Sequence, residues 1–262
     1  MEPIGKAAEL FDLTGETALV TGASSGLGER FARVLAAHGA KTVLAARRAD
    51  RLDRTAADIK RSGGQAIAVP LDVARTEELA AVFDKIEKHY GVCSILVNNA
   101  GMAATGKALE ISEADWRRVM DVNLNSVWFL AQEAGRRLAA AGRPGTIINV
   151  ASMLGMRILP GVAHYNVAKA GVIHMTRALA IELAPNGIRV NAMAPGWVES
   201  EMTEAYLGSP RSEATRKAIP LGRVGKAADL DGVLLLLASA KASGFMTGAV
   251  IAVDGGHMWS FV

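Results

Sequence analysis

The chain has very little of several features that mark particular classes of protein. Of its 262 residues, only one is cysteine and 5% are aromatic, and the net charge is only +3. A single cysteine, Cys93, cannot form a disulfide within the chain, so we expect a reducing compartment and a cytoplasmic protein. The 29 basic residues are spread along the sequence, whereas nucleic-acid-binding proteins gather them on one face. We therefore expect no nucleic-acid partner.

Long apolar runs and metal-ligand patterns are missing as well. The longest aliphatic run, Val233 to Ala238, is far shorter than the ~20 residues of a membrane span. The N-terminal residues carry no signal-peptide pattern. The five histidines show no metal-ligand spacing with cysteine or carboxylates. The sequence therefore predicts neither a membrane partner nor a metal site.

What the chain does have is a regular alternation of short β-rich runs with longer helical patterns. Strands are expected at residues 17–20, 42–46, 67–71, 95–97, 146–150, 189–194 and 249–253, and the two longest helices at about 113–141 and 165–184. The strand segments are apolar on both faces, as a sheet covered by helices on both sides requires. This pattern predicts a single α/β domain over residues 1–262, with a Rossmann-type doubly wound parallel sheet.

The turn after the first expected strand carries three glycines in the spacing G-x-x-x-G-x-G, from Gly22 to Gly28. Such glycines let the backbone approach a pyrophosphate, which then lies at the positive end of a helix. An ordinary strand-to-helix turn is the first alternative. The second is the nucleophile elbow of a hydrolase, because the residues around Ser24 match G-x-S-x-G and Asp254 and His257 follow in the required order. That interpretation leaves the later motifs unexplained.

Two arginines, Arg47 and Arg48, follow the second expected strand at a place where an NAD-binding fold carries an acidic residue. The nearby Asp50 is better placed to cap the next helix. Guanidinium groups bind phosphate through paired hydrogen bonds, so the arginines favour NADP(H), with its 2′-phosphate, over NAD(H), which stays possible. The alternative is a pair of solvated surface arginines.

Three polar residues follow the fifth expected strand: Ser152, Tyr165 and Lys169. Tyr165 and Lys169 are four positions apart in a helical pattern and therefore share one face. An ammonium group beside a tyrosine lowers the pKa of the phenol, which can then give or take a proton in carbonyl reduction or alcohol oxidation. The pair is a weak motif alone, and its place in a nucleotide-binding pattern makes it a candidate catalytic site.

Taken together, the ordered motifs resemble those of the short-chain dehydrogenase/reductase family, over about residues 13–256. They are Thr21-Gly22-x-x-x-Gly26-x-Gly28, Asn98-Asn99-Ala100-Gly101, Asn123 within Asp121-Val122-Asn123-Leu124, Ser152, Tyr165-x-x-x-Lys169 and Pro195-Gly196. The resemblance implies a 3-oxoacyl reductase-like or carbonyl reductase-like oxidoreductase that transfers a hydride between NADP(H) and a ketone or secondary alcohol. The alternatives are the same chemistry with NAD(H), or a catalytically idle nucleotide-sensing protein on the same fold.

The resemblance also implies a role for each site residue. Tyr165 would be the catalytic acid/base, and Ser152 would bind the substrate oxygen. Lys169 would lower the pKa of Tyr165 and hold the nicotinamide ribose, and Asn123 would position a water of a proton relay. Asn98 would brace the sheet. The expected cofactor-binding residues are Gly22, Ser24, Ser25, Gly26, Leu27, Gly28, Arg47, Arg48, Asp72, Val73, Asn99, Ala100, Gly101, Tyr165, Lys169, Pro195, Gly196, Val198 and Ser200.

Two longer segments carry further expectations. The irregular stretch at about 197–220 corresponds to the substrate lid of the family that the chain resembles. The helix at 165–184 has few charges and residues 122–131 have none, and a helix that is apolar nearly all round is buried on more than one side. We therefore expect a homotetramer or homodimer built on these helices, unless other parts of the same chain cover them.

Overall fold

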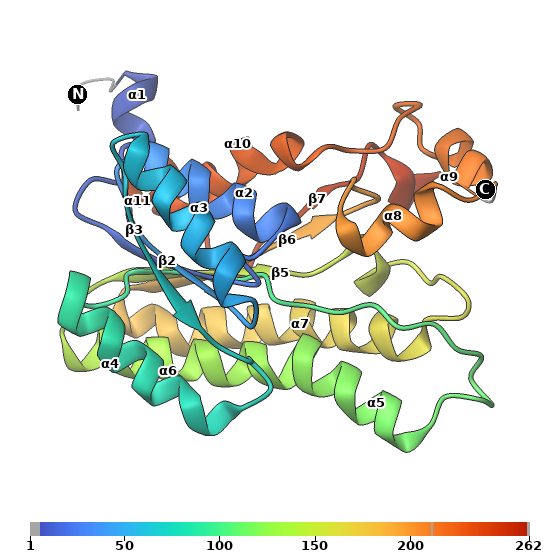
Figure 1. The fold of residues 1–262 in the computed structure, drawn as a ribbon, viewed down its shortest axis with the longest axis horizontal. Coiled ribbons are helices and arrows are strands. Elements are labelled where there is room, and N and C mark those ends of the chain that lie inside the picture. Colours follow the sequence, from blue (N-terminus) through green and yellow to red (C-terminus); the bar gives the residue numbers. More distant parts are fainter. Residues whose placement is uncertain (1–5, 211, 261–262) are drawn as a thin grey trace.

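The computed structural model of the chain describes residues 6–210 and 212–260. The seven expected strands all form, and they pair in parallel in one sheet with the order β3-β2-β1-β4-β5-β6-β7 (Figure 1). Their bounds are β1 Thr17–Thr21, β2 Lys41–Ala46, β3 Gln65–Pro70, β4 Ile95–Asn98, β5 Gly145–Val150, β6 Ile188–Pro195 and β7 Val250–Val253. The predicted Rossmann-type sheet is confirmed.

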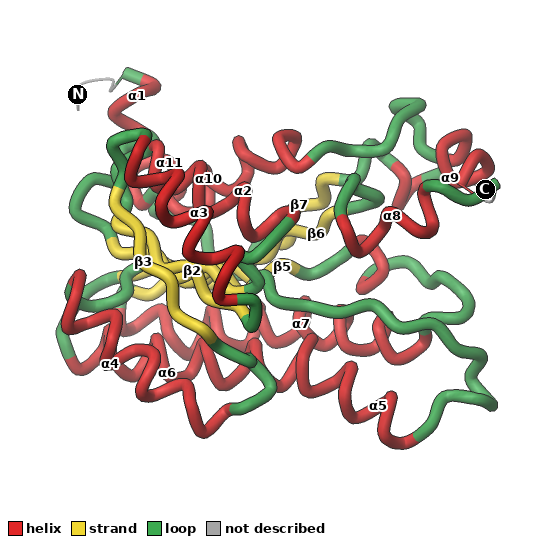
Figure 2. Tube along the Cα trace, in the orientation of Figure 1, coloured by secondary structure: helices red, strands yellow, loops and turns green. Residues whose placement is uncertain are grey.

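Helices cover both faces of the sheet (Figures 1 and 2). One face carries α2 (Gly26–Ala37), α3 (Ala49–Arg61) and α10 (Asp231–Ala238), and the other carries α4 (Leu79–Tyr90), α6 (Ser126–Ala140) and α7 (Ala163–Leu183). The remaining α-helices are α1 Ala7–Leu10, α5 Glu113–Met120, α8 Glu201–Leu207, α9 Ser212–Ala218 and α11 Ala240–Ser243. Single 3-10 turns lie at Thr76–Glu78, Met153–Gly155, Ala184–Asn186, Ala227–Leu230 and His257–Trp259. None of the helices at 6–210 and 212–260 combines the length and the apolar character that a bilayer crossing needs.

The core is divided between the two faces by the alternation of side chains along each strand. In β1, Val20 packs in one apolar cluster with Phe31 of α2, while Leu19 packs in another with Phe83 of α4. All four side chains are fully buried. This arrangement explains why the central strands carry apolar side chains toward both faces, because helices cover each face of the sheet there.

The long helix expected at 113–141 contains a π-helical turn, Asp121–Asn125, between α5 and α6. The backbone stays helical through it, and the N–H of Ser126 bonds to the carbonyl of Asp121, five residues back. A π-turn places one extra residue in a helix and is often found at functional sites. Hydrophobic periodicity does not reveal it, because one added residue shifts the pattern too little. The turn carries Asn123, which is completely buried.

The expected helix cap at Asp50 is wrong. The helix α3 begins one residue earlier, at Ala49, and Asp50 lies in its first turn. Its carboxylate accepts a hydrogen bond from Arg54 Nη2 at 2.9 Å, one turn further along. A negative charge there is still favourable, because the N-terminal end of a helix is electropositive. The segment at 197–220 is also more regular than expected, because α8 and α9 lie in it; helices of seven residues are too short to show periodicity.

A chain of buried amide and hydroxyl groups joins the sheet to α7. Asn98 Nδ2 in β4 donates to Asn149 Oδ1 in β5 at 2.9 Å, and Asn149 Nδ2 donates to Thr176 Oγ1 in α7 at 2.9 Å. Thr176 in turn donates to the carbonyl of Val172 at 2.8 Å. The residue expected to brace the sheet, Asn98, therefore bridges two central strands. Buried polar groups of this kind are costly to leave unpaired.

We predict that Asn149→Leu lowers the free energy of unfolding by about 1–3 kcal/mol, because it leaves the Asn98 amide without its closest acceptor. Urea unfolding curves measure this. Ile148→Val, which deletes one buried methyl group from the same strand, is the control and should cost about 0.5–1.5 kcal/mol. An Asn149→Leu protein as stable as the wild type would contradict the prediction.

Candidate active site

A cleft of about 320 Å³ lies at the carboxyl ends of the strands. It sits where the sheet order turns from β1 toward β2 on one side and toward β4 on the other, which is where doubly wound folds bind ligands. Every residue expected to contact the cofactor lines this cleft, and so does Ser152. Met202, one of the methionines that the sequence places near the cleft, also lines it. So do residues that the sequence did not single out: Ala46, Leu71, Met102, Val122, Val150, Ala151, Glu201 and Thr203. Most are direct neighbours of predicted ones.

The glycine-rich turn forms a cradle that only glycine fits. Gly22 has a φ of +67°, a conformation that L-residues with side chains rarely adopt. A Cβ atom at Gly28 would overlap the carbonyl oxygen of Gly22. The turn leads directly into α2, whose first residue is Gly26, so backbone N–H groups and the helix dipole face the cleft. The cradle fits the pyrophosphate of a dinucleotide.

Hydrogen bonds hold the ends of β1 and β4 together at this point. Thr21 Oγ1 accepts from the backbone N–H groups of Asn99 and Ala100, both at 3.0 Å. The Asn99 side chain returns a bond from Nδ2 to the carbonyl of Thr21 at 2.9 Å. These contacts fix Asn99, Ala100 and Gly101 beside the glycine cradle.

The three catalytic candidates Ser152, Tyr165 and Lys169 meet at one wall of the cleft. The Lys169 ammonium is buried, donates to the carbonyl of Val150 at 2.8 Å and lies 5.7 Å from the centre of the Tyr165 ring. Ser152 follows β5 and lies close enough to the phenol of Tyr165 to lower its pKa. The end of β5 and helix α7 thus bring Ser152 together with two residues that are 13 and 17 positions away in the sequence.

The net effect of the surroundings on the pKa of Tyr165 is opposite to the lowering expected from Lys169. Burial raises the pKa of the Tyr165 phenol, and the nearby Ser152 side chain offsets this rise only in part. Burial also lowers the pKa of Lys169 to about 8. Both shifts have the same origin, because a low-dielectric surrounding disfavours the charged form of each group. The free protein therefore holds Tyr165 protonated.

Asn123 lies beneath the cleft, next to these residues. Its Nδ2 donates to the carbonyls of Val119 and Met102, both at 3.0 Å, and its Oδ1 accepts from the N–H of Met102 at 3.1 Å. A Cβ atom on Gly101 would lie 3.0 Å from Asn123 Oδ1 and 3.8 Å from Lys169 Nζ. The amide thus ties the π-turn to the loop after β4, and both of its N–H groups are used within the protein.

The arginines after β2 differ in their surroundings. Arg47 lines the cleft, is exposed, and makes no hydrogen bond or ion pair with the residues that the structure describes. Arg48 donates from Nε and Nη2 to Ser24 Oγ, at 3.1 and 3.0 Å, and from Nη2 to Ser25 Oγ at 2.7 Å. The predicted serines and arginine therefore form one cluster.

The triad required by the hydrolase alternative is not formed. The Ser24 hydroxyl bonds to Arg48, and no imidazole or carboxylate is hydrogen-bonded to it within the described part of the chain. Asp254 instead accepts from the backbone N–H groups of Gly256 and Met258, at 2.9 and 2.7 Å. The described ranges 6–210 and 212–260 also contain no group of three or more His, Cys, Asp or Glu side chains that could hold a metal ion.

Comparison with known proteins gives consistent matches over nearly the whole chain. Residues 22–258 match the family model described as Enoyl-(Acyl carrier protein) reductase. The chain is 40% identical to a 3-oxoacyl-[acyl-carrier-protein] reductase of Synechocystis sp., over 93% of this chain and 97% of that protein. A short-chain type dehydrogenase/reductase from Mycobacterium marinum has a similar structure, with a TM-score of 0.91, 38% identity and coverage of 96% and 99% of the two chains. A gluconate 5-dehydrogenase from Burkholderia cenocepacia, solved with NADP and tartrate, is also similar. Its TM-score is 0.93 at 34% identity, and the match covers 97% of this chain and 100% of that chain.

The lowered pKa of Lys169 predicts a stability that depends on pH. The folded pKa of about 8 lies below the ordinary value of 10.5, so the unfolded chain holds the proton more tightly between these values. The free energy of unfolding of the cofactor-free protein should therefore rise, relative to that of Lys169→Met, by about 3 kcal/mol as the pH increases across this window. Urea titrations of both proteins near the two ends of the window measure it, and a constant difference would contradict it.

Proposed function

Because the chain belongs to the short-chain dehydrogenase/reductase family, we propose that it transfers a hydride between NADP(H) and a ketone or secondary alcohol, with Tyr165 as acid/base. The observation that carries the proposal is the meeting of Ser152, Tyr165 and Lys169 at the wall of the cleft that also holds the glycine cradle. A nucleotide-binding cradle alone would need none of these three side chains.

The residues of the chain account for the proton and for the placement of the substrate. A nicotinamide cofactor, when bound, supplies the hydride. The Ser152 hydroxyl and the Tyr165 phenol hydrogen-bond to the substrate oxygen and polarise the C=O bond. In reduction, Tyr165 gives its proton to the oxygen as the carbonyl becomes an alcohol; in oxidation, it takes the proton back.

The electrostatics of the free protein suit the reductive direction of this step. Burial keeps Tyr165 protonated, which a proton donor requires. The Lys169 ammonium, whose pKa is about 8, is mostly charged at neutral pH and lies 5.7 Å from the Tyr165 ring centre. A cation at that position stabilises the phenolate that remains after the proton has left. Asn123 supports the pair by fixing the neighbouring loop.

The preference for NADP(H) over NAD(H) rests on the end of β2. Arg47 is exposed at the cleft and has no described partner, so it is available to a 2′-phosphate. Ser24 and Arg48 supply further donors at the same end of the cleft. The solved relative from Burkholderia cenocepacia has NADP bound. An arginine in this position accommodates the phosphate that distinguishes the two cofactors.

We assign the substrate lid to residues 197–220. The rings of Trp197 and Tyr206 stack with centroids 4.4 Å apart, and Tyr206 Oη bonds to Thr215 Oγ1 at 2.6 Å, which ties α8 to α9. Val198 and Met202 line the cleft from this segment. Because Ser200, Glu201 and Thr203 of the segment line the cleft as well, it is suited to determine which substrate enters.

We also infer a homotetramer or homodimer and a cytoplasmic location. Large apolar side chains are exposed on the helices that were expected to form the interface: Phe129 of α6 is 41% exposed, and Val167 and Ile181 of α7 are 47% and 78% exposed. A second copy of the chain would cover them. With a single cysteine, Cys93, the chain cannot form an internal disulfide, which suits a protein kept in a reducing compartment.

The acid/base role predicts that Tyr165→Phe lowers kcat by about 10²–10⁴-fold, because the proton donor is lost while the ring remains. Ketone reduction with NADPH measures kcat, and nicotinamide fluorescence shows that the cofactor still binds. Turnover near that of the wild type would remove Tyr165 from the mechanism. Cofactor binding without any turnover by the wild type would favour the idle nucleotide-sensing alternative.

The cofactor assignment predicts that Arg47→Asp weakens NADPH binding by about tenfold or more. The substitution replaces a positively charged hydrogen-bond donor with a carboxylate, which repels the negative 2′-phosphate. Binding of NADH should change little. Titration of both cofactors against the wild type and the variant, followed by nicotinamide fluorescence, measures the ratio. An unchanged ratio would show that Arg47 is only a surface charge.

A further inference from the structure

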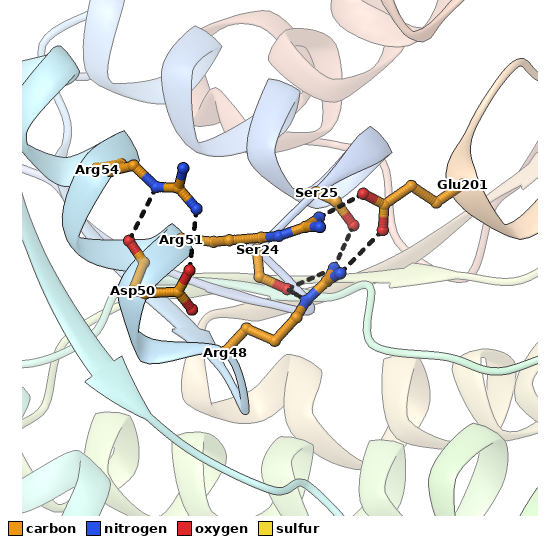
Figure 3. Close-up of polar contacts among 7 residues, drawn as sticks. All are labelled: Ser24, Ser25, Arg48, Asp50, Arg51, Arg54 and Glu201. Atoms are coloured by element: carbon orange, nitrogen blue, oxygen red, sulfur yellow. Dashed lines mark hydrogen bonds and ion pairs between the residues drawn. The ribbon is translucent and has the colours of Figure 1, made fainter.

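An acidic side chain lies at the end of the cleft that Ser24, Arg47 and Arg48 line, which we call the phosphate end. Glu201 is the first residue of α8, and it reaches the loop and helix that follow β2 (Figure 3). Its Oε2 accepts from Arg48 Nη1 at 3.0 Å, and its Oε1 accepts from Arg51 Nη1. The carboxylate therefore forms ion pairs with two arginines that come from a distant part of the sequence.

The pairing uses the same guanidinium that would meet a 2′-phosphate. Figure 3 shows the guanidinium of Arg48 surrounded by the hydroxyls of Ser24 and Ser25 and the carboxylate of Glu201. Its Nε and Nη2 face the serines, and Nη1 faces Glu201. A phosphate that bonds to Arg48 in paired fashion must displace one of these oxygen atoms, and Glu201 is the only anion among them.

The charge of Glu201 persists under all ordinary conditions. Hydrogen bonds from Arg51 and Arg48 lower the pKa of its carboxyl to about 2. A phosphate that enters beside it therefore meets a like charge, as well as a guanidinium that is already paired. The adenosine of NAD(H) carries a hydroxyl at the same place and meets neither obstacle.

We propose that Glu201 is a specificity-determining residue, whose carboxylate occupies part of the 2′-phosphate subsite and weakens NADP(H) binding relative to NAD(H). The proposal rests on the proposed function, in which this cleft binds a nicotinamide cofactor. In this arrangement Arg47 attracts the phosphate, while the Arg48–Glu201 pair opposes it. The balance of the two sets how strongly the protein distinguishes the cofactors.

The test is the substitution Glu201→Gln, which keeps the size of the side chain and removes its charge. Glu204→Gln is the matched control: it removes the same charge from the same helix, and Glu204 is exposed, does not line the cleft and has no described partner. Nicotinamide fluorescence gives the Kd of NADPH and of NADH for each protein. Displacement of NADPH by adenosine 2′-monophosphate or adenosine 5′-monophosphate isolates the contribution of the 2′-phosphate.

We expect Glu201→Gln to bind NADPH and adenosine 2′-monophosphate about threefold to tenfold more tightly, with the Kd of NADH within about twofold of the wild type. Glu204→Gln should match the wild type. An unchanged NADPH to NADH ratio in Glu201→Gln, or an equal loss for both cofactors, would overturn the proposal and leave the carboxylate a purely structural role in α8.

Binding of NADPH and NADH by the wild type separates the role proposed for Glu201 from the proposed function of the protein. Tighter binding of NADPH by Glu201→Gln supports the role of Glu201 even if the wild type prefers NADH, in which case only the assignment of cofactor preference fails. A wild type that binds neither cofactor would overturn both.

Discussion

The junction between β1 and β4 is the contact on which the rest of the site depends. Two backbone N–H groups after β4 bond to Thr21 Oγ1, and the Asn99 side chain bonds back to the carbonyl of Thr21. The crossovers leave in opposite directions on either side of this junction, so helices cannot cover the strand ends there. The cleft exists because the sheet order reverses at these two strands. Because Gly22 and Gly28 have no Cβ atoms, the glycine-rich turn after β1 can lie directly against the loop after β4.

The second constraint is the burial of polar groups behind the cleft. The amides of Asn98 and Asn149 link the central strands to α7, and Asn123 links the π-turn to the loop after β4. Because unpaired amides would be costly in this interior, each of these contacts fixes one element relative to the next. The result is a rigid frame behind Tyr165 and Lys169, whose pKa values are set by the same lack of water.

The two ends of the cleft use charge in opposite ways. At the catalytic end, a single buried ammonium faces a neutral phenol, and burial shifts both pKa values toward the uncharged forms. At the phosphate end, exposed arginines and Glu201 stay ionised and are open to water, so their interactions are screened and readily exchanged. The first end is therefore suited to moving a proton, and the second to binding and releasing a charged group.

The sequence by itself determined the order of strands and helices along the chain and the glycine turn, because periodicity and local turn chemistry depend on near neighbours. The resemblance to a family supplied the expected cofactor-binding residues, all of which line the cleft. It did not reveal the π-turn around Asn123, the start of α3 at Ala49 or the short helices α8 and α9, since each differs from a regular pattern by only a few residues. Only the tertiary structure decided that burial raises the pKa of Tyr165 against the effect expected of Lys169. It alone also placed Glu201 against Arg48, 153 positions away in the sequence, because long-range contacts leave no local trace.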